Sequence, residues 1–67
     1  MKYAKLRGLI REKFGTQEAF AAAANMRPAT LSSRLSGRTD WSCSEMETTA
    51  KLLGIQPEEV HLYFFAL

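Results

Sequence analysis

Apolar residues recur along this chain at helical spacing, with short polar or glycine-containing stretches between them. Tyr3, Leu6, Ile10 and Phe14 follow one another every three or four positions, which predicts an amphipathic helix over about residues 2–14. The same spacing predicts helices over residues 17–24, over residues 28–36, after Ser42 and after Gln56. No stretch alternates polar and apolar residues, so we expect an all-α bundle of five short helices.

Residues that favour helix ends stand at the boundaries of these segments. Thr16 and Ser42 are suitable N-caps, and Ser42 with Glu45 has the S-x-x-E spacing of a capping box. Gly15 and Asn25 follow the first and second helices, where the backbone often takes the left-handed conformation. The side chains expected to face inward include Phe20, Ala21, Leu31, Leu35, Met46, Ala50 and Leu53.

The second and third helices are separated only by residues 25–27, with the small Ala21 at their expected crossing. This spacing is typical of a helix-turn-helix, whose second helix enters the major groove of DNA, and also of an ordinary helical hairpin. The outward positions of the third helix hold no acidic residue, and arginines flank them. Ordinary exposed helices mix acidic and basic residues, so this composition favours the DNA-binding interpretation. The outward side chains are Ala29, Ser33 and Ser36, with Thr30 and Ser32 beside them.

Three stretches carry a resemblance to a known family. They are Gly15-Thr16-Gln17-Glu18-Ala19-Phe20-Ala21, Thr30-Leu31-Ser32 and Leu35-Ser36-Gly37-Arg38. These stretches resemble the Cro-type, lambda-repressor-like (XRE) helix-turn-helix family, and the remainder resembles its small phage-derived Cro-like members. The resemblance implies a single lambda-repressor-like DNA-binding domain over residues 1–67, with the helix-turn-helix formed by the second and third helices. Asn25 stands where the family usually has glycine, and Pro28-Ala29 stands where many members have hydrogen-bonding residues.

A third helix lying in the major groove would bring two sets of residues to DNA. Pro28 and Ala29 donate no hydrogen bond to a base, so we expect apolar contacts there, such as one to a thymine methyl group. Arginine binds guanine through two hydrogen bonds, so Arg34 or Arg27 is the expected main reader, although Arg34 could instead contact only phosphate. The expected base-reading residues are Arg27, Pro28, Ala29, Ser32, Ser33 and Arg34. The expected phosphate contacts are Thr16, Gln17, Thr30, Ser36, Arg38, Thr39 and Ser42.

The charges of the chain are divided unevenly between its two parts. The formal net charge is +2, but residues 1–38 hold eight basic and two acidic side chains, a formal +6. Residues 39–67 hold one basic and five acidic side chains, a formal −4. We therefore expect one face to meet a polyanion. Arg7 and Arg11, at i and i+4 on the first helix, are expected to be solvated.

The composition also excludes several classes of protein. One cysteine, Cys43, and one histidine, His61, cannot form a disulfide framework or a Cys/His metal site. No apolar run approaches the length of about 20 residues that a membrane span needs, and the N-terminus lacks a signal-peptide pattern. The sequence offers no convergent set of titratable groups of the kind that an enzyme active site requires, so we do not expect an enzyme. We expect a cytoplasmic protein with no cofactor, metal or small-molecule ligand.

The last helix carries three adjacent aromatic residues, Tyr63, Phe64 and Phe65. One helix cannot bury all three on one face, so at least one should be exposed or meet a partner. The expected inward stripe is Val60, Tyr63, Phe64 and Leu67, and the expected dimer or partner contacts are Val60, Tyr63, Phe64 and Phe65. Alternatively, a monomer wraps these aromatics around its own core. Trp41 is expected to cover the core, or to donate its indole N–H to phosphate.

These features favour a sequence-specific regulator that binds double-stranded DNA, similar to phage or prophage Cro-like repressors. It would occupy a palindromic or pseudo-palindromic operator as a homodimer, with two recognition helices one DNA turn, about 34 Å, apart. The alternative is a protein-interaction module on the same scaffold, either antitoxin-like or an anti-repressor.

Overall fold

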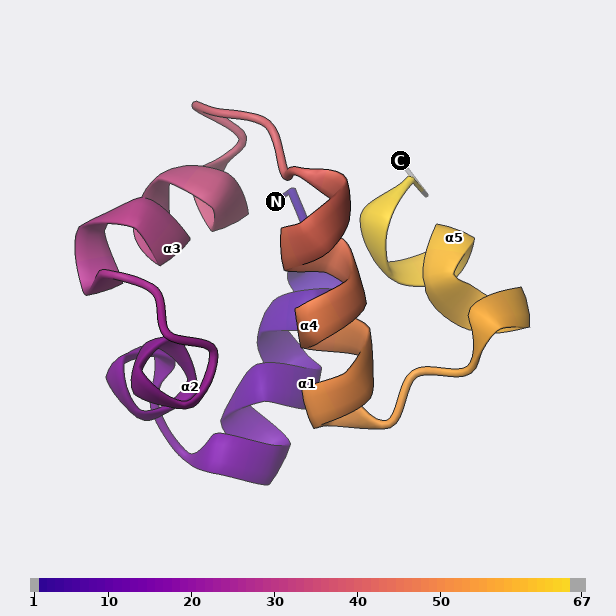
Figure 1. Ribbon diagram of the computed structural model, residues 1–67, viewed down its shortest axis with the longest axis horizontal. Coiled ribbons are helices and arrows are strands. Elements are labelled where there is room, and N and C mark those ends of the chain that lie inside the picture. The colour runs from indigo at the N-terminus through magenta and orange to yellow at the C-terminus, as the bar shows by residue number, and fades with distance from the viewer. Residues whose placement is uncertain (1, 66–67) are drawn as a thin grey trace.

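The computed structural model describes residues 2–65 of the chain. Its helices are α1 (Ala4–Phe14), α2 (Gln17–Ala23), α3 (Pro28–Ser36), α4 (Cys43–Leu53), the short 3-10 helix η1 (Pro57–Glu59) and α5 (Val60–Phe64). No strand occurs in this part of the chain, which confirms the predicted all-α bundle of five helices. In Figure 1, α2 and α3 lie at the left, α5 lies at the right, and α1 and α4 lie between them. No helix within residues 2–65 is long and apolar enough to cross a membrane.

The caps expected from the sequence are present. The Thr16 hydroxyl accepts a hydrogen bond from the Ala19 N–H (3.1 Å). Ser42 and Glu45 form the complete capping box at the start of α4. Asn25 takes the left-handed conformation, with φ 57°, directly before the connection to α3. Gly37 ends α3 with φ 81°, a left-handed backbone conformation that is energetically unfavourable for a residue with a Cβ atom.

Two ends differ from the sequence prediction. The first helix begins at Ala4 because Tyr3 takes a left-handed conformation, φ 58°, and its ring meets Trp41 at 6.3 Å between ring centroids. The last helical segment begins as a 3-10 turn at Pro57 and becomes α-helical only at Val60. Leu67, expected on the apolar stripe of this helix, lies outside the described residues.

One hydrophobic core joins the helices, and α1 touches α2, α4 and α5. Its buried members are Leu6, Ile10, Phe20, Ala21, Leu31, Leu35, Leu53, Ile55 and Phe64. On α4, the expected inward face was only partly right, because Thr49 and Leu53 are buried whereas Met46 and Ala50 are half-buried. The face of α4 that carries Met46 and Ala50 turns toward η1 and α5.

Trp41 closes the core between the start of the chain and its last helix. Its ring packs edge-to-face with Phe64, with 5.1 Å between the centroids, and also edge-to-face with Tyr3. The indole Nε1 is buried and has no hydrogen-bond partner among residues 2–65. This placement supports the expected core-covering role, since a buried N–H is not presented to phosphate.

Candidate nucleic-acid interface

The α2–α3 pair has the close packing that its sequence predicted. Ala21 is fully buried, and its carbonyl oxygen accepts a hydrogen bond from the Met26 N–H (2.8 Å). The Ala22 carbonyl oxygen accepts a second bond from the Asn25 N–H (3.2 Å). These bonds hold residues 24–27 in a tight turn, and Arg27 then enters α3 in an extended conformation. α3 packs chiefly against α2.

The surface of α3 turned away from the core carries small residues and no carboxylate. Leu31 and Leu35 are fully buried, which fixes the opposite side of α3 as the outward one. The exposed residues are Pro28, Ala29, Ser32 and Ser36, whereas Thr30, Ser33 and Arg34 are half-buried. Exposed Arg27 precedes α3 and exposed Arg38 follows it. We call this surface, from Arg27 to Arg38, the α3 surface.

Arg34 points to the flank of α3 and is held there by other side chains. Its Nε donates to Oε1 of Glu45 (2.8 Å) and its Nη2 donates to Oε2 (3.1 Å), so the pair is bidentate. Its Nη1 donates to the hydroxyl of Thr39. The hydrogen bond from Arg34 lowers the pKa of the Glu45 carboxyl, and the same bond raises the pKa of Arg34. Both groups are therefore charged at neutral pH.

This ion pair bears directly on the role expected for Arg34. A guanidinium that binds guanine through two hydrogen bonds would first have to leave Glu45, whose carboxylate presents the same geometry. Arg27 has no such partner among the described residues and is exposed at the start of α3. From its position in the sequence, Glu45 was expected only in the capping box, and its bond to Arg34 was not predicted.

Most of the expected phosphate contacts are exposed, and several already make local hydrogen bonds. Ser36 Oγ donates to the Ser33 carbonyl oxygen (3.0 Å). Thr16 and Ser42 use their hydroxyl oxygens to cap helices, and Thr39 accepts from Arg34. The exposed members of the set are Thr16, Ser36, Arg38, Thr39 and Ser42, whereas Gln17 and Thr30 are half-buried.

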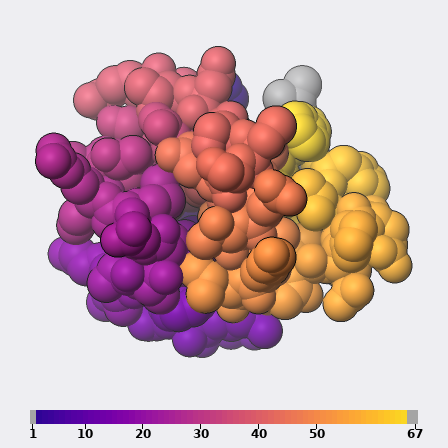
Figure 2. Space-filling view, in the orientation of Figure 1, coloured from indigo at the N-terminus to yellow at the C-terminus, as the bar shows by residue number. Residues whose placement is uncertain are grey.

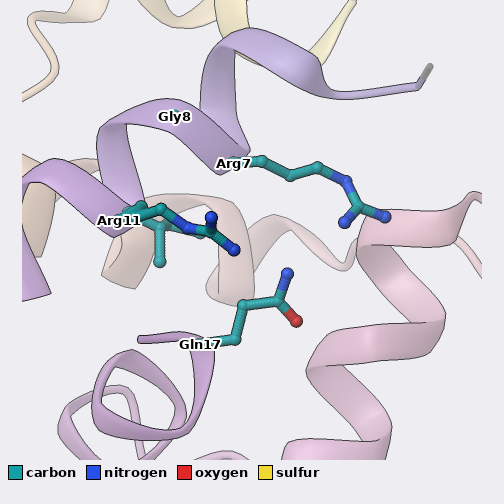
Figure 3. Close-up of a pocket in the computed structure, with 5 residues that line it drawn as sticks. Arg7, Gly8, Arg11 and Gln17 are labelled. Atoms are coloured by element: carbon teal, nitrogen blue, oxygen red, sulfur yellow. The ribbon is translucent and has the colours of Figure 1, made fainter. Parts of the chain in front are cut away.

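A second basic cluster lies between α1 and α2. Arg7, Arg11 and Gln17 line a pocket of about 290 Å³ (Figure 3). The expectation of a fully solvated arginine pair was wrong for Arg7, which is half-buried and extends from α1 to donate to the Leu35 carbonyl oxygen (3.2 Å). A cation bound to a carbonyl in the last turn of α3 complements the negative end of that helix. Arg11 is exposed, as expected.

The expected partner contacts divide between the core and the surface. Phe64 is buried against Trp41, so it belongs to the core rather than to a contact surface. Phe65 is 65% exposed, which confirms that one of the three adjacent aromatics is not covered. Val60 and Phe65 line a groove of about 740 Å³ beside α4, which we call the α4–α5 groove. Its other lining residues are Cys43, Met46, Glu47, Ala50, Lys51, Ile55 and Pro57.

Titratable groups do not gather into a metal site in the part of the chain that the structure describes. No group of three or more His, Cys, Asp or Glu side chains there could hold an ion. Cys43 is free and exposed at the start of α4, and His61 is exposed on α5.

One of the solved structures that match this chain is that of a bacteriophage protein. It is the solution structure of the modulator of repression (MOR) of the temperate bacteriophage TP901-1 from Lactococcus lactis. The two chains are 34% identical, the TM-score is 0.85, and the match covers 96% of this chain and 86% of that chain. No curated protein matches this chain. The likeness to Cro-type helix-turn-helix proteins remains an interpretation of the sequence motifs.

The family comparison covers almost the whole chain. Residues 1–66 match the family described as "Protein of unknown function (DUF739)". A match over this length, together with a similar fold in a protein 34% identical, assigns the chain at the level of family. The protein belongs to the DUF739 family.

Proposed function

We propose that this chain is a phage-type transcriptional regulator that binds double-stranded DNA through the α3 surface. The observation that carries the proposal is an exposed helix face without carboxylates, bounded by exposed Arg27 and Arg38. Such a face can approach base edges while arginines meet the phosphates on either side. The similar structure is named a modulator of repression of a temperate bacteriophage, which agrees with a role in a phage regulatory circuit.

In this proposal the residues of the α3 surface divide the work of recognition. Arg27 takes the main base-reading role because its guanidinium is exposed, whereas that of Arg34 is bound to Glu45. Pro28 and Ala29 make apolar contacts, and Ser32 adds a hydrogen bond of low selectivity. The phosphates on either side of the groove are bound by two sets of groups. One set is the hydroxyls and N–H groups at the helix starts, and the other is the Arg38 guanidinium beyond the end of α3.

The proposal includes a homodimer on DNA. Two copies related by a two-fold axis would place their α3 helices in successive major grooves of a palindromic or pseudo-palindromic operator. No cofactor, metal or catalytic step belongs to this mechanism, because occupancy of the operator is itself the regulatory event.

Arg27→Ala is expected to lower affinity for the preferred DNA site by 10-fold or more and to relax its base preference. The reason is that one bidentate arginine–guanine contact discriminates by about 1–3 kcal/mol. The preferred site is first selected from a random duplex library with the wild-type chain. Affinities of wild type and variant are then measured on that site and on its single-base variants.

Lys13→Ala is the matched control, since Lys13 is an exposed cation on α1, away from the α3 surface. It removes the same charge and should keep the base preference. If Arg27→Ala lowered affinity for every sequence alike, Arg27 would be a phosphate contact only. If the wild-type chain selected no sequence and bound no duplex at low salt, the proposal of DNA binding would fail.

A second candidate function is protein binding through the α4–α5 groove, in the manner of an anti-repressor or an antitoxin-like module. The specific observation in its favour is the exposed Phe65 at an apolar groove on the end of the molecule away from α3. Exposed apolar patches of this kind mark interaction sites.

Phe65→Ser is expected to abolish specific capture of a protein partner if this second function holds. Phe65 is 65% exposed, so the change should leave the fold intact. The measurement is capture from a lysate of the lysogenic host by wild type and variant, followed by a binding titration with the captured protein. Equal capture by the two chains would reject the groove as the binding surface.

A further inference from the structure

The guanidinium of Arg34 connects three consecutive parts of the chain, namely α3, the segment 37–42 and the start of α4. It binds both carboxylate oxygens of Glu45 in the first turn of α4, and it binds Thr39 in the segment 37–42. α3 packs chiefly on α2, so this ion pair is a direct link between α3 and α4. In the space-filling view the segment 37–42 borders both α3 and the start of α4 (Figure 2).

The carboxylate of Glu45 has a second bond that fixes the other end of the same segment. Its Oε1 accepts from the Ser42 N–H (2.9 Å), while the Ser42 hydroxyl accepts from the Glu45 N–H (3.1 Å). The segment 37–42 is therefore held at Thr39 through Arg34 and at Ser42 through Glu45. Arg38 lies between the end of α3 and Thr39. Its N–H donates to the Ser33 carbonyl oxygen (3.0 Å).

Charge gives a second reason to separate Arg34 from the base-reading residues. Arg34 and Glu45 form a close pair whose charges cancel, so the pair adds no net attraction for DNA. Arg38 is exposed at the end of the α3 surface and no ion pair involves it among residues 2–65. Its charge is therefore available to a phosphate at this end of α3, where the exposed side chain of Lys2 also lies beside Gly37.

We propose that Arg34 and Glu45 are positioning residues, which hold the segment 37–42 so that Arg38 meets the phosphate backbone. Arg34 does not touch DNA in this arrangement and acts only through Arg38. The inference rests on the proposed DNA-binding function and extends it by assigning the residues that place one phosphate contact.

The test uses a double variant that preserves the charge of the pair. Arg34→Met with Glu45→Gln replaces an ion pair of zero net charge by two uncharged side chains, and glutamine can still complete a capping box. We expect affinity to fall about fivefold to tenfold on the selected site and on random DNA alike, with their ratio unchanged. The slope of log affinity against log salt should fall by about one, as when one phosphate contact is lost.

The decisive comparison is made on an Arg38→Ala background. If Arg34 acts through Arg38, adding the double variant to Arg38→Ala should lower affinity by less than about twofold further. Full additivity would overturn the proposal, and so would an unchanged affinity in the double variant. A fall in the ratio of specific to random binding would overturn it too, because Arg34 would then be reading bases.

A control variant and an independent readout complete the design. Glu12→Gln with Lys13→Met removes an exposed pair of opposite charges on α1 and should leave affinity unchanged. Amide hydrogen exchange at Thr39 is measured without DNA, and it should be faster in the Arg34–Glu45 double variant. Equal exchange rates would overturn the positioning role. Wild-type chain that binds no DNA would reject the proposed function, while exchange would still decide whether the segment is held.

Discussion

Glutamate in place of Ser32 is expected to weaken DNA binding at least a hundredfold while the chain stays folded. Ser32 is exposed on the outward side of α3, and no carboxylate lies on that helix. In the major groove a carboxylate there would face phosphates on both sides and would lose water without gaining a partner. The measurement is a binding titration on the selected site, with circular dichroism to show that the helices are retained.

Gln56→Glu is the matched control for this prediction. Gln56 is exposed in the connection between α4 and η1, so the variant adds the same charge away from the α3 surface. Its affinity should fall only about twofold to threefold, and less at higher salt, because the charge acts at a distance. If the two variants lost affinity equally, the effect of Ser32→Glu would be explained by its net charge alone. An unchanged affinity in Ser32→Glu would reject α3 as the DNA-binding helix.

The helix boundaries were largely predictable because the signals that set them are local. Pro28 begins α3 and Ser42 caps α4, as expected, and each acts on backbone groups within one turn. The side chains that face the core from α2 and α3 also followed from their spacing, since Leu31 and Leu35 lie one turn apart. The carboxylate-free outer side of α3 was therefore foreseeable, but Ser33, expected to point outward, is half-buried, and Ser32, expected beside that face, is exposed.

Interactions between distant residues were not predictable from spacing. Arg34 and Glu45 are 11 positions apart, and Arg7 and the Leu35 carbonyl are 28 positions apart. Each bond depends on how a connecting segment folds back, and a charged residue gives no sign of which partner it will reach. The role expected for Arg34 rested only on its position along α3. That position does not reveal that the start of α4 lies beside the Arg34 side chain.

The buried side of α4 shows a different reason for a missed prediction. Apolar spacing selected Met46 and Ala50, but the structure buries Thr49 fully, one turn before Leu53. Threonine counts as polar in a periodicity argument, although its methyl group packs well in a core. The exposed aromatic that follows α5, Phe65, was predicted only as one of three, because packing of Trp41 on Phe64 decides which one stays outside.

Phe20→Ala is expected to unfold a large share of the molecules at room temperature. Phe20 is fully buried, and its ring meets that of Phe14 edge-on at 5.2 Å between centroids. Truncating a buried phenylalanine costs about 3–5 kcal/mol, because apolar contacts are lost and a cavity remains. A core in a domain this small rarely supplies more than about 3–5 kcal/mol in total, so the loss is comparable with the whole free energy of unfolding.

Urea denaturation followed by circular dichroism gives the free energy of unfolding of each variant. Phe65→Ala is the matched control, since it removes the same side chain from a position 65% exposed and should change that free energy by less than about 0.5 kcal/mol. Phe20 lies on α2, against which α3 packs, so its loss should also abolish DNA binding. A Phe20→Ala chain that unfolds within about 1 kcal/mol of wild type would contradict the packing of α2 in the core.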